Sequence, residues 1–379
     1  MDKRNKLLRN NTVQSLIASI VCIIVGLFIG YIVLLIINPS GAWGAITAVI
    51  KNFLYYPSKP AAIKYFGSTL VKAAPLIMCS LSVLFAYKAG LFNIGAAGQY
   101  VAGAGACLYM ALAVKAPWWI CLLAAAAAGA IFGAVSGALK AYCNVNEVIS
   151  CIMLNWIGLY AVNMILSNVK EPASPYTVQL ASKNPGALLP SMGLSSLFYK
   201  NQYVTIAIPL SIFAAILIWV VLDKTKFGFE LKATGLNKFA ARYCGMKEKK
   251  NLILTMVISG ALAGLGAAFF YLSGMEQWSC TQTSVPGMGF NGIAAAFLGG
   301  LHPIGVIFSS FFIQHITDGG VHVDTNLYST EISQLISAII IYLCGFVLFT
   351  KHLLNHVLQK TEKSSLPDKT KQRKGGDNT

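Results

Sequence analysis

Charge is scarce in this chain, and acidic residues are the scarcest. Charged residues make up 11% of the 379 residues, and only 13 residues are Asp or Glu. Soluble domains carry about 25% charged residues, whereas 56% of this chain is apolar or aromatic and its mean hydropathy is +0.64. A soluble enzyme, a secreted disulfide scaffold and a disordered chain are therefore excluded, and an integral membrane protein remains.

Several motifs that carry chemistry are also missing. No Gly is followed by Lys, so the chain has no G-x-x-x-x-G-K-[ST] loop to bind phosphates for ATP hydrolysis. The nine cysteines lie singly, most within apolar runs, and are interpreted as small buried hydrophobes kept reduced. The five histidines lack the spacing of a metal site or a nucleophile-activating base. The sequence thus predicts no enzyme, no metal site and no cofactor.

Basic residues are what the chain has in excess, with a net charge of +16. Three hydrophilic stretches hold most of it: 1–12 carries +3, 223–250 carries +5 and 351–379 carries +4. These residues flank long apolar runs and do not form one basic face interleaved with aromatics, which argues against a nucleic-acid partner. The positive-inside rule instead predicts cytoplasmic termini, 1–12 and 351–379, around a transmembrane domain over 13–350.

Apolar runs of about 20 residues predict the membrane spans. The stretch 290–318 is interrupted by paired glycines and by a proline, and we expect it to be re-entrant, which keeps the tail on the cytoplasmic side. The fold class is therefore an all-α polytopic bundle of about 8–10 helices that includes broken or re-entrant segments. The expected spans are 13–37, 66–87, 96–114, 118–139, 148–167, 203–222, 251–272 and 332–350.

Two outer segments between the spans are long enough to have a shape of their own. Residues 38–62 combine aromatics with Pro57 and Pro60, which suits an interfacial helix followed by a turn. Residues 168–202 contain four prolines. Both segments are candidate docking surfaces for a molecule that arrives from outside.

Polar residues mark two breaks inside the apolar runs. The first break carries Asn93 and Gln99, and the second carries Asn291. Irregular backbone at membrane depth is tolerated only where protein or a water-filled cavity covers it, so both breaks are candidates for a translocation path. The alternative for both asparagines is a helix cap. The breaks also echo each other, Phe-Asn-Ile-Gly-Ala-Ala against Phe-Asn-Gly-Ile-Ala-Ala, through an inverted repeat or by chance.

The span after 147 has its own polar groups. Asn146 has the position of an N-cap, and Glu147 falls in the first turn, where the helix dipole favours an acid. Asn155 lies two turns deeper and needs a partner in the bundle. Trp156 beside it offers an aromatic face for a base or a sugar.

The basic stretch 223–250 contains a predicted short helix. Asn237 is its expected N-cap and Gly245 its stop. A solvated charged loop is the alternative, but solvation does not require the aromatic residues Phe239 and Tyr243. An amphipathic helix that is presented to a cytoplasmic partner suits them better.

Four sequence blocks resemble the permease subunit of bacterial ATP-binding-cassette importers for nucleosides and simple sugars, in the superfamily of ribose and branched-chain amino acid permeases. The blocks are 90–99, 146–155, 227–245 and 289–300, the last followed by Pro-Ile-Gly. They occur in the order and with the spacing that the family has. Two positions depart from its pattern: Ala97 replaces a Glu, and Asn291 replaces an Asp. Both changes imply a less negative path.

The resemblance implies partners and roles. The partners are two ATP-binding-cassette subunits or one double-cassette ATPase, a second related permease, and an extracellular substrate-binding lipoprotein. The implied location is the bacterial cytoplasmic membrane, with transport by alternating access. Residues expected to couple to the ATPase are Gly235, Asn237, Ala241, Arg242 and Gly245, and those expected along the substrate path are Asn93, Gln99, Asn155, Trp156 and Asn291.

Other functions remain as alternatives. A permease for ribose-like sugars or branched-chain amino acids belongs to the same superfamily. A secondary transporter driven by an ion gradient would need a membrane-embedded Asp, Glu or His. Apart from Glu147, near a helix end, the apolar runs offer almost none.

Overall fold

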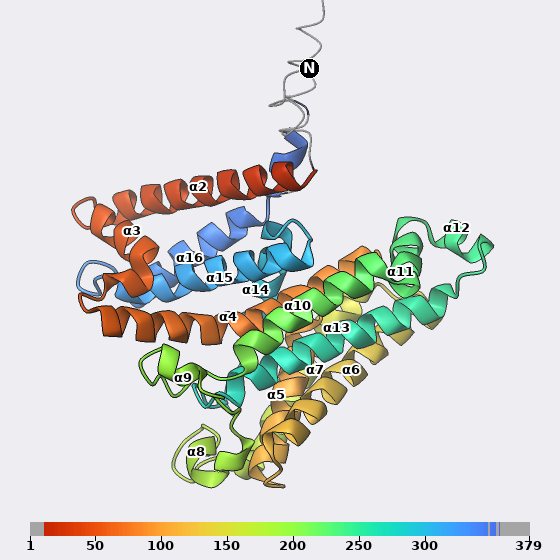
Figure 1. The fold of residues 1–379 in the computed structure, drawn as a ribbon, viewed down its shortest axis with the longest axis horizontal. Helices are drawn as coiled ribbons and strands as arrows, with labels where there is room; N and C mark the ends of the chain where they lie inside the picture. The colour runs from red at the N-terminus through yellow and green to blue at the C-terminus, as the bar shows by residue number, and fades with distance from the viewer. Residues whose placement is uncertain (1–10, 348, 354–355, 357–379) are drawn as a thin grey trace, which may run out of the picture.

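The computed structural model describes residues 11–347, 349–353 and 356, and these form helices joined by turns and loops (Figure 1). The basic segment 1–12 and the basic tail 351–379 lie mostly outside the described residues. The helices are α2 (Asn11–Ile37), α3 (Ala42–Lys51), η1 (Asn52–Tyr55), α4 (Lys59–Lys88), α5 (Ala96–Leu112), α6 (Trp118–Cys143), α7 (Glu147–Leu166), η2 (Ser167–Val169), α8 (Leu180–Lys183), η3 (Pro185–Ala187), α9 (Leu194–Leu197), α10 (Ala207–Lys224), α11 (Lys226–Leu236), α12 (Lys238–Tyr243), α13 (Glu248–Tyr271), α14 (Met288–Leu298), α15 (Pro303–Gly319), η4 (Gly320–His322) and α16 (Thr330–Cys344).

Six of these helices are long and apolar enough to cross a membrane, namely α2, α4, α6, α7, α10 and α13. The shorter helices α5, α14, α15 and α16 pack with them. The predicted all-α polytopic bundle with broken segments is therefore confirmed. One boundary was wrong: α4 begins at Lys59 and not near 66, because Ser58 caps it by accepting from Ala61 N, with Pro60 in the first turn.

Glycine contacts hold the centre of the bundle together. Helix α13 crosses α6 where Gly260 and Gly264 face Gly129 and Gly133, and a side chain at any of the four would collide with backbone of the other helix. In lipid, apolar contact alone gains little, so small residues stabilise helix pairs by letting backbones approach closely. The glycine-rich sequence of α13 is thus explained by packing.

The chain reverses direction between α14 and α15. Gly300 and Leu301 take positive φ values of 67° and 53°, and Ser309 Oγ donates to Ala295 O at 2.6 Å across the two helices. The far end of α15 returns to α3, where His315 Nε2 lies 2.8 Å from Ile50 O. The reversal expected within 290–318 is therefore observed, with two helices as its limbs.

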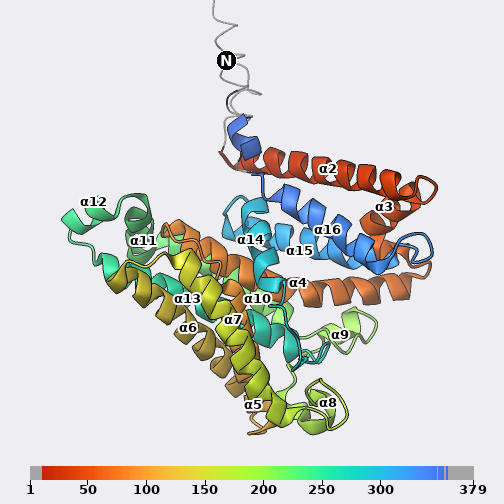
Figure 2. The ribbon, with the colours of Figure 1, turned by 180° about the vertical axis from the view of Figure 1, so that it is seen from behind.

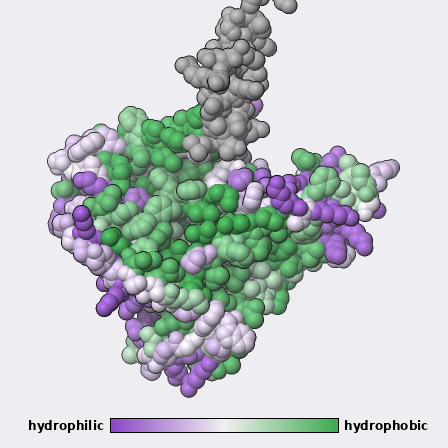
Figure 3. Space-filling view, in the orientation of Figure 1, coloured by the Kyte–Doolittle hydropathy of each residue, from purple (hydrophilic) through white to green (hydrophobic). Residues whose placement is uncertain are grey.

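The bundle has two polar ends. One, the α12 end, carries α11 and α12, and the other, the α3 end, carries α3, α8 and α9 (Figures 1 and 2). The first turns of α2 and the residues after α16 lie together, with Cys22 Sγ 3.2 Å from Thr350 Oγ1. Apolar side chains cover the middle of the visible face, and hydrophilic ones gather over the α12 projection and toward the opposite edges (Figure 3).

The expected helix and turn over 38–62 are present as α3 and η1. The expectation for the cysteines holds for Cys22, Cys79, Cys107, Cys121 and Cys151, which are buried and free. It was wrong for Cys143 and Cys244, which are exposed because they lie at helix ends on the α12 side, where no neighbouring helix covers them.

Candidate functional site

The first break is closed by hydrogen bonds between buried amide side chains. Asn93 and Gln99 exchange two hydrogen bonds, Nδ2 to Oε1 at 2.9 Å and Nε2 to Oδ1 at 3.1 Å. Asn93 Nδ2 also donates to Ser82 Oγ at 3.1 Å, and the two amide side chains are 0% and 2% exposed. The N-cap of α5 is Gly95, without a side-chain cap bond, so the cap alternative for Asn93 is wrong. Its amide bonds a distant side chain instead.

Asn155 finds the partner that its sequence position required. Its Oδ1 accepts from Gly98 N at 2.8 Å, and its Nδ2 donates to Ile94 O at 3.2 Å. The side chain therefore joins α7 to both sides of the first break and is 3% exposed. Trp156 does not join this group: it is 42% exposed on the outer side of α7 and stacks on Tyr160 at 6.3 Å.

The segment expected to be the second break, 290–296, is not a break: it lies within α14, which packs against the first break. Gly289 of α14 packs on the backbone of Ala97 in α5, so close that no side chain would fit at 289. Asn291 is half-buried in the first turn of α14, whose N-cap is Gly287. The cap alternative for Asn291 is therefore wrong as well. The structure brings together Asn93, Gln99 and Asn155, with Asn291 on the adjoining helix.

Three polar residues that the sequence analysis missed fix the chain before α14. Trp278 Nε1 donates to Asn163 Oδ1 at 2.9 Å, and Asn163 Nδ2 donates to Gln282 O at 2.9 Å. Gln282 follows in the run Thr-Gln-Thr-Ser, a polar stretch between two apolar helices. That stretch was the available signal, and it was overlooked because it contains neither Gly nor a charge.

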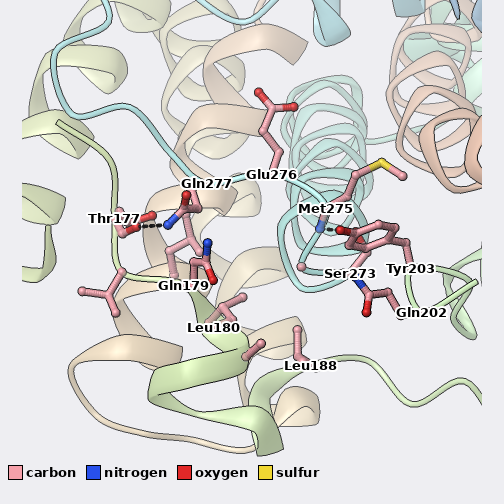
Figure 4. Close-up of a pocket in the computed structure, with 14 residues that line it drawn as sticks. Thr177, Gln179, Leu180, Leu188, Gln202, Tyr203, Ser273, Met275, Glu276 and Gln277 are labelled. Carbon is pink, nitrogen blue, oxygen red and sulfur yellow. Dashed lines mark hydrogen bonds between the residues drawn. The ribbon is translucent and has the colours of Figure 1, made fainter. Parts of the chain in front are cut away.

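A cavity of about 290 Å³ opens at the α3 end. Figure 4 shows Gln277 pointing at Thr177, whose carbonyl oxygen accepts from Gln277 Nε2 at 2.7 Å, while Glu276 extends away from them. Glu276 is partly exposed, and its contact with protein raises the pKa of its carboxyl group by desolvation, against a smaller opposing effect of Lys72. The polar groups at this mouth can hydrogen-bond a neutral solute.

An ion pair links α4 and α15 on the same side. Lys72 Nζ lies 2.9 Å from Asp318 Oδ1, and Gln314 Nε2 donates to the same oxygen at 3.0 Å. The sequence gives no signal for this pair, since the two residues are far apart along the chain. Each neutralises the other, which permits both to lie beside apolar helices.

Glu147 behaves as expected, with one addition. Asn146 Oδ1 caps α7 by accepting from Val148 N at 2.9 Å. The carboxylate also lies 2.8 Å from Lys140 Nζ of α6. An acid that is paired in this way serves to join the ends of α6 and α7.

The short helix α12 is present within the boundaries that the sequence predicts. Asn237 Oδ1 accepts from Phe239 N at 3.0 Å and Ala240 N at 3.1 Å, and Gly245 follows the helix with φ +79°. Ala241 is buried at 4%, whereas Phe239 and Tyr243 are 67% and 96% exposed. Large aromatic side chains on a protruding helix are typical of a docking surface.

Gly235 faces the bundle. A Cβ at this position would lie 2.6 Å from Gly90 N and 2.6 Å from Ala89 C. The end of α11 therefore rests on the turn that opens the first break, in direct backbone contact with it.

Arg242 is exposed and lines a basic cleft of about 590 Å³ with Tyr142 and Lys247. Lys249 and Lys250 lie in the same cleft. Within the described ranges, no group of three or more His, Cys, Asp or Glu is placed to hold a metal ion. The cleft instead offers positive charge beside α12, which suits an acidic protein surface.

Comparison with known proteins gives a family match over most of the chain. Residues 65–345 match the family described as "Branched-chain amino acid transport system / permease component". No solved structure matches the chain.

Three curated relatives illustrate the range of this similarity. The chain is 33% identical over 340 residues to the guanosine ABC transporter permease protein NupP of Bacillus subtilis (strain 168), covering 87% of this chain and 93% of that protein. It is 31% identical over 374 residues to the nucleoside ABC transporter permease protein NupB of Lactococcus lactis subsp. cremoris (strain MG1363), covering 96% and 99%. The glucose ABC transporter permease protein TsgB13 of Haloferax volcanii is 30% identical over 289 residues, covering 73% and 75%.

Proposed function

The chain belongs to the family of branched-chain amino acid transport system permease components, and we propose that it is the membrane-spanning subunit of an ATP-driven importer of nucleosides or related simple sugars. The observation that carries the proposal is α12, an exposed aromatic helix on a chain without a phosphate-binding loop. The two relatives at 31–33% identity are named as guanosine and nucleoside permeases, which favours nucleosides over the amino acids in the family description.

The proposed assembly contains partners that supply what this chain lacks. ATP is hydrolysed by two ATP-binding-cassette subunits or one double-cassette ATPase at the α12 end. A second related permease completes the passage, and a substrate-binding lipoprotein delivers solute to the α3 end. The proposed location is the bacterial cytoplasmic membrane with both termini inside, because the positive-inside rule assigns the basic stretches to the cytoplasm, and the described start of α2 lies toward the side that carries α12 (Figure 1).

Coupling follows from the contacts of α11 and α12. The ATPase contacts Phe239, Tyr243 and Arg242, and closure of the ATPase moves α12. Asn237, Ala241 and Gly245 define the helix, and Gly235 passes its displacement to the turn at Ala89 and Gly90. Since that turn opens the first break, the displacement reaches α5 and changes which side of the bundle is accessible.

The solute path requires hydrogen bonds more than charge. Asn93, Gln99 and Asn155 hold the first break in place, while Asn291 and the aromatic face of Trp156 line the path beside it. With Ala97 and Asn291 at positions where related chains carry acids, a neutral polyhydroxylated solute fits this lining better than a cation. Ribose-like sugars and branched-chain amino acids are the alternatives, and an ion-coupled secondary transporter is a further one.

The test is uptake by the reconstituted complex. Tyr243→Ala should reduce ATP-dependent nucleoside uptake at least tenfold and release the ATPase on purification, because truncating an anchor side chain costs about 2 kcal/mol or more. Arg242→Glu should have the same effect through charge repulsion. Tyr342→Ala, a tyrosine that is 67% exposed on α16 and does not line the cleft beside α12, should leave uptake nearly unchanged. Uptake by this chain without any ATPase would contradict the proposal.

A further inference from the structure

Residues 281–287 run as non-helical chain along α7. Asn163, one turn before the end of α7, holds Gln282 O at 2.9 Å. Gly289 packs on Ala97 at the level where Asn155 meets Gly98. From Asn163 to Asn155 the helix descends about 12 Å, at 1.5 Å per residue. The segment therefore leaves the α3 end and enters the apolar belt before α14 begins.

Several main-chain N–H groups of this segment are unpaired among the described residues. The N–H groups of Thr283, Ser284 and Val285 have no hydrogen-bond partner among the described residues. Thr281, Thr283, Ser284 and Gly287 are exposed. Unpaired main-chain groups are not tolerated against lipid tails, and they occur at membrane depth only where protein or water covers them. The surface in front of this segment is therefore not lipid.

One side-chain group points to a ligand more directly. Gln282 Nε2 is buried, and it has no hydrogen-bond partner within the described part of the chain. The residue itself is held in place through its carbonyl by Asn163, which Trp278 fixes in turn. Buried polar atoms are almost always paired, so a fixed donor without a partner is suited to a molecule that is not part of this chain.

The exposed residues around this segment differ in chemistry from those of α10. Figure 2 shows α7, α14 and the chain between α13 and α14 on the viewer's side. Trp156 and Tyr160 of α7 and Phe290 of α14 are exposed. In Figure 1 the helix α10 lies in front, and its exposed side chains, such as Phe213, are apolar and typical of a lipid contact. Hydroxyl groups, unpaired N–H groups and exposed aromatic rings thus belong to the neighbouring elements α7, α14 and the chain before α14.

We propose that residues 281–287 line a water-filled passage for a neutral polyhydroxylated solute, with Gln282 as a hydrogen-bond donor to it and Trp156 and Tyr160 as its aromatic wall. The passage lies between this chain and the second permease subunit, and to that extent it rests on the proposed function. Hydroxyl and amide groups match the hydroxyls of a ribose, and aromatic rings match the faces of a base.

Thiol labelling in the assembled importer tests the passage. Cys280, the one partly exposed native cysteine near the segment, is first replaced by Ser. In that background Thr283→Cys and Ser284→Cys should react with a charged, membrane-impermeant thiol reagent at least tenfold faster than Phe213→Cys. Phe213 is the matched control because it is also exposed but lies on α10, in the half of that helix nearer the α3 end. Saturating nucleoside should slow the reaction. Labelling no faster than at Phe213→Cys, in a complex that still imports, would overturn the proposal.

A second variant tests the solute contact. Gln282→Leu should lower the maximal uptake rate about tenfold, while ATPase assembly and the labelling of Thr283→Cys are retained. Unchanged uptake would remove Gln282 from the passage. The two proposals fail separately: rapid labelling in a complex that does not import nucleosides keeps the passage and rejects the nucleoside, whereas nucleoside import without labelling does the reverse.

Discussion

Two non-helical segments of the bundle, the first break before α5 and the open break of residues 281–287 before α14, have opposite surroundings. At the first, Asn93 and Gln99 bond each other and are 0% and 2% exposed. At the second, Thr283 and Ser284 are exposed, and Gln282 Nε2 has no partner among the described residues. A Phe-Asn motif with small residues therefore does not by itself mark an interruption: at 92–97 it spans the non-helical break before α5, whereas at 290–295 it lies within α14.

Helix α7 contributes to both breaks. Asn155 satisfies Ile94 O and Gly98 N at the first, and Asn163, two turns further along, holds Gln282 O at the second. The first break is also covered by α14 through Ala97 and Gly289. The second has no such cover on its outer side, and this difference separates a joint that transmits movement from a surface that solute can reach.

The largest expected effect comes from the turn that joins the first break to α11. Gly90→Val should abolish uptake and lower the free energy of unfolding by about 2 kcal/mol or more, since a branched residue is strained at φ +75°. It would also collide with Gly235, 2.9 Å from an added Cβ. Uptake assays and thermal melting in detergent measure the two effects.

Gly193→Val is the matched control for this variant. Gly193 has φ +84°, and an added Cβ there meets nothing within 4 Å. Gly193→Val should lower the melting temperature through backbone strain but should leave uptake unchanged. If the two valine variants reduce uptake equally, the contact between α11 and the first break has no role in coupling.

The second prediction compares the breaks directly. Asn93→Leu strands the buried Gln99 amide and should lower the free energy of unfolding by about 1–3 kcal/mol. The double variant Asn93→Leu with Gln99→Met should recover part of that loss, because both partners are then apolar. Gln282→Leu should change the free energy of unfolding by less than about 0.5 kcal/mol, since its side-chain Nε2 has no hydrogen-bond partner to lose among the described residues. Equal losses at both breaks, measured by detergent melting, would contradict the distinction between sealed and open.

Much of the fold could be predicted from the sequence because it depends on local patterns. Apolar run lengths predict the spans, and the cap chemistry of Asn146 and Asn237 predicts where α7 and α12 begin. The break at Asn93 follows from small and polar residues in an apolar run. Each of these features is encoded within a few neighbouring residues, so no knowledge of packing is required.

The candidate site depends on contacts that local patterns do not contain. The pairing of Asn93 with Gln99, the ion pair of Lys72 with Asp318 and the contact of Gly235 with Gly90 are set by tertiary packing. The sequence therefore indicated Gly235 as a coupling residue but not that it faces inward. The open segment before α14 was missed for the same reason, since Thr and Ser look alike in a buried turn and in a water-filled passage.

The smallest expected effect concerns Glu276, which lies on the loop that leads to the open break. Desolvation raises its carboxyl pKa above the ordinary value of 4.5, against partial compensation by Lys72. At a pH between the ordinary pKa and the raised pKa, the carboxyl group holds a proton in the folded state that it has lost in the unfolded state. The free energy of unfolding should therefore fall as pH rises from the ordinary value through the raised one. Because the side chain stays partly exposed, the change should be small. Glu276→Gln should remove this dependence of stability on pH when melting temperatures are compared across the same pH range. An unchanged dependence would assign it to another carboxyl group and would mean that Glu276 is fully hydrated.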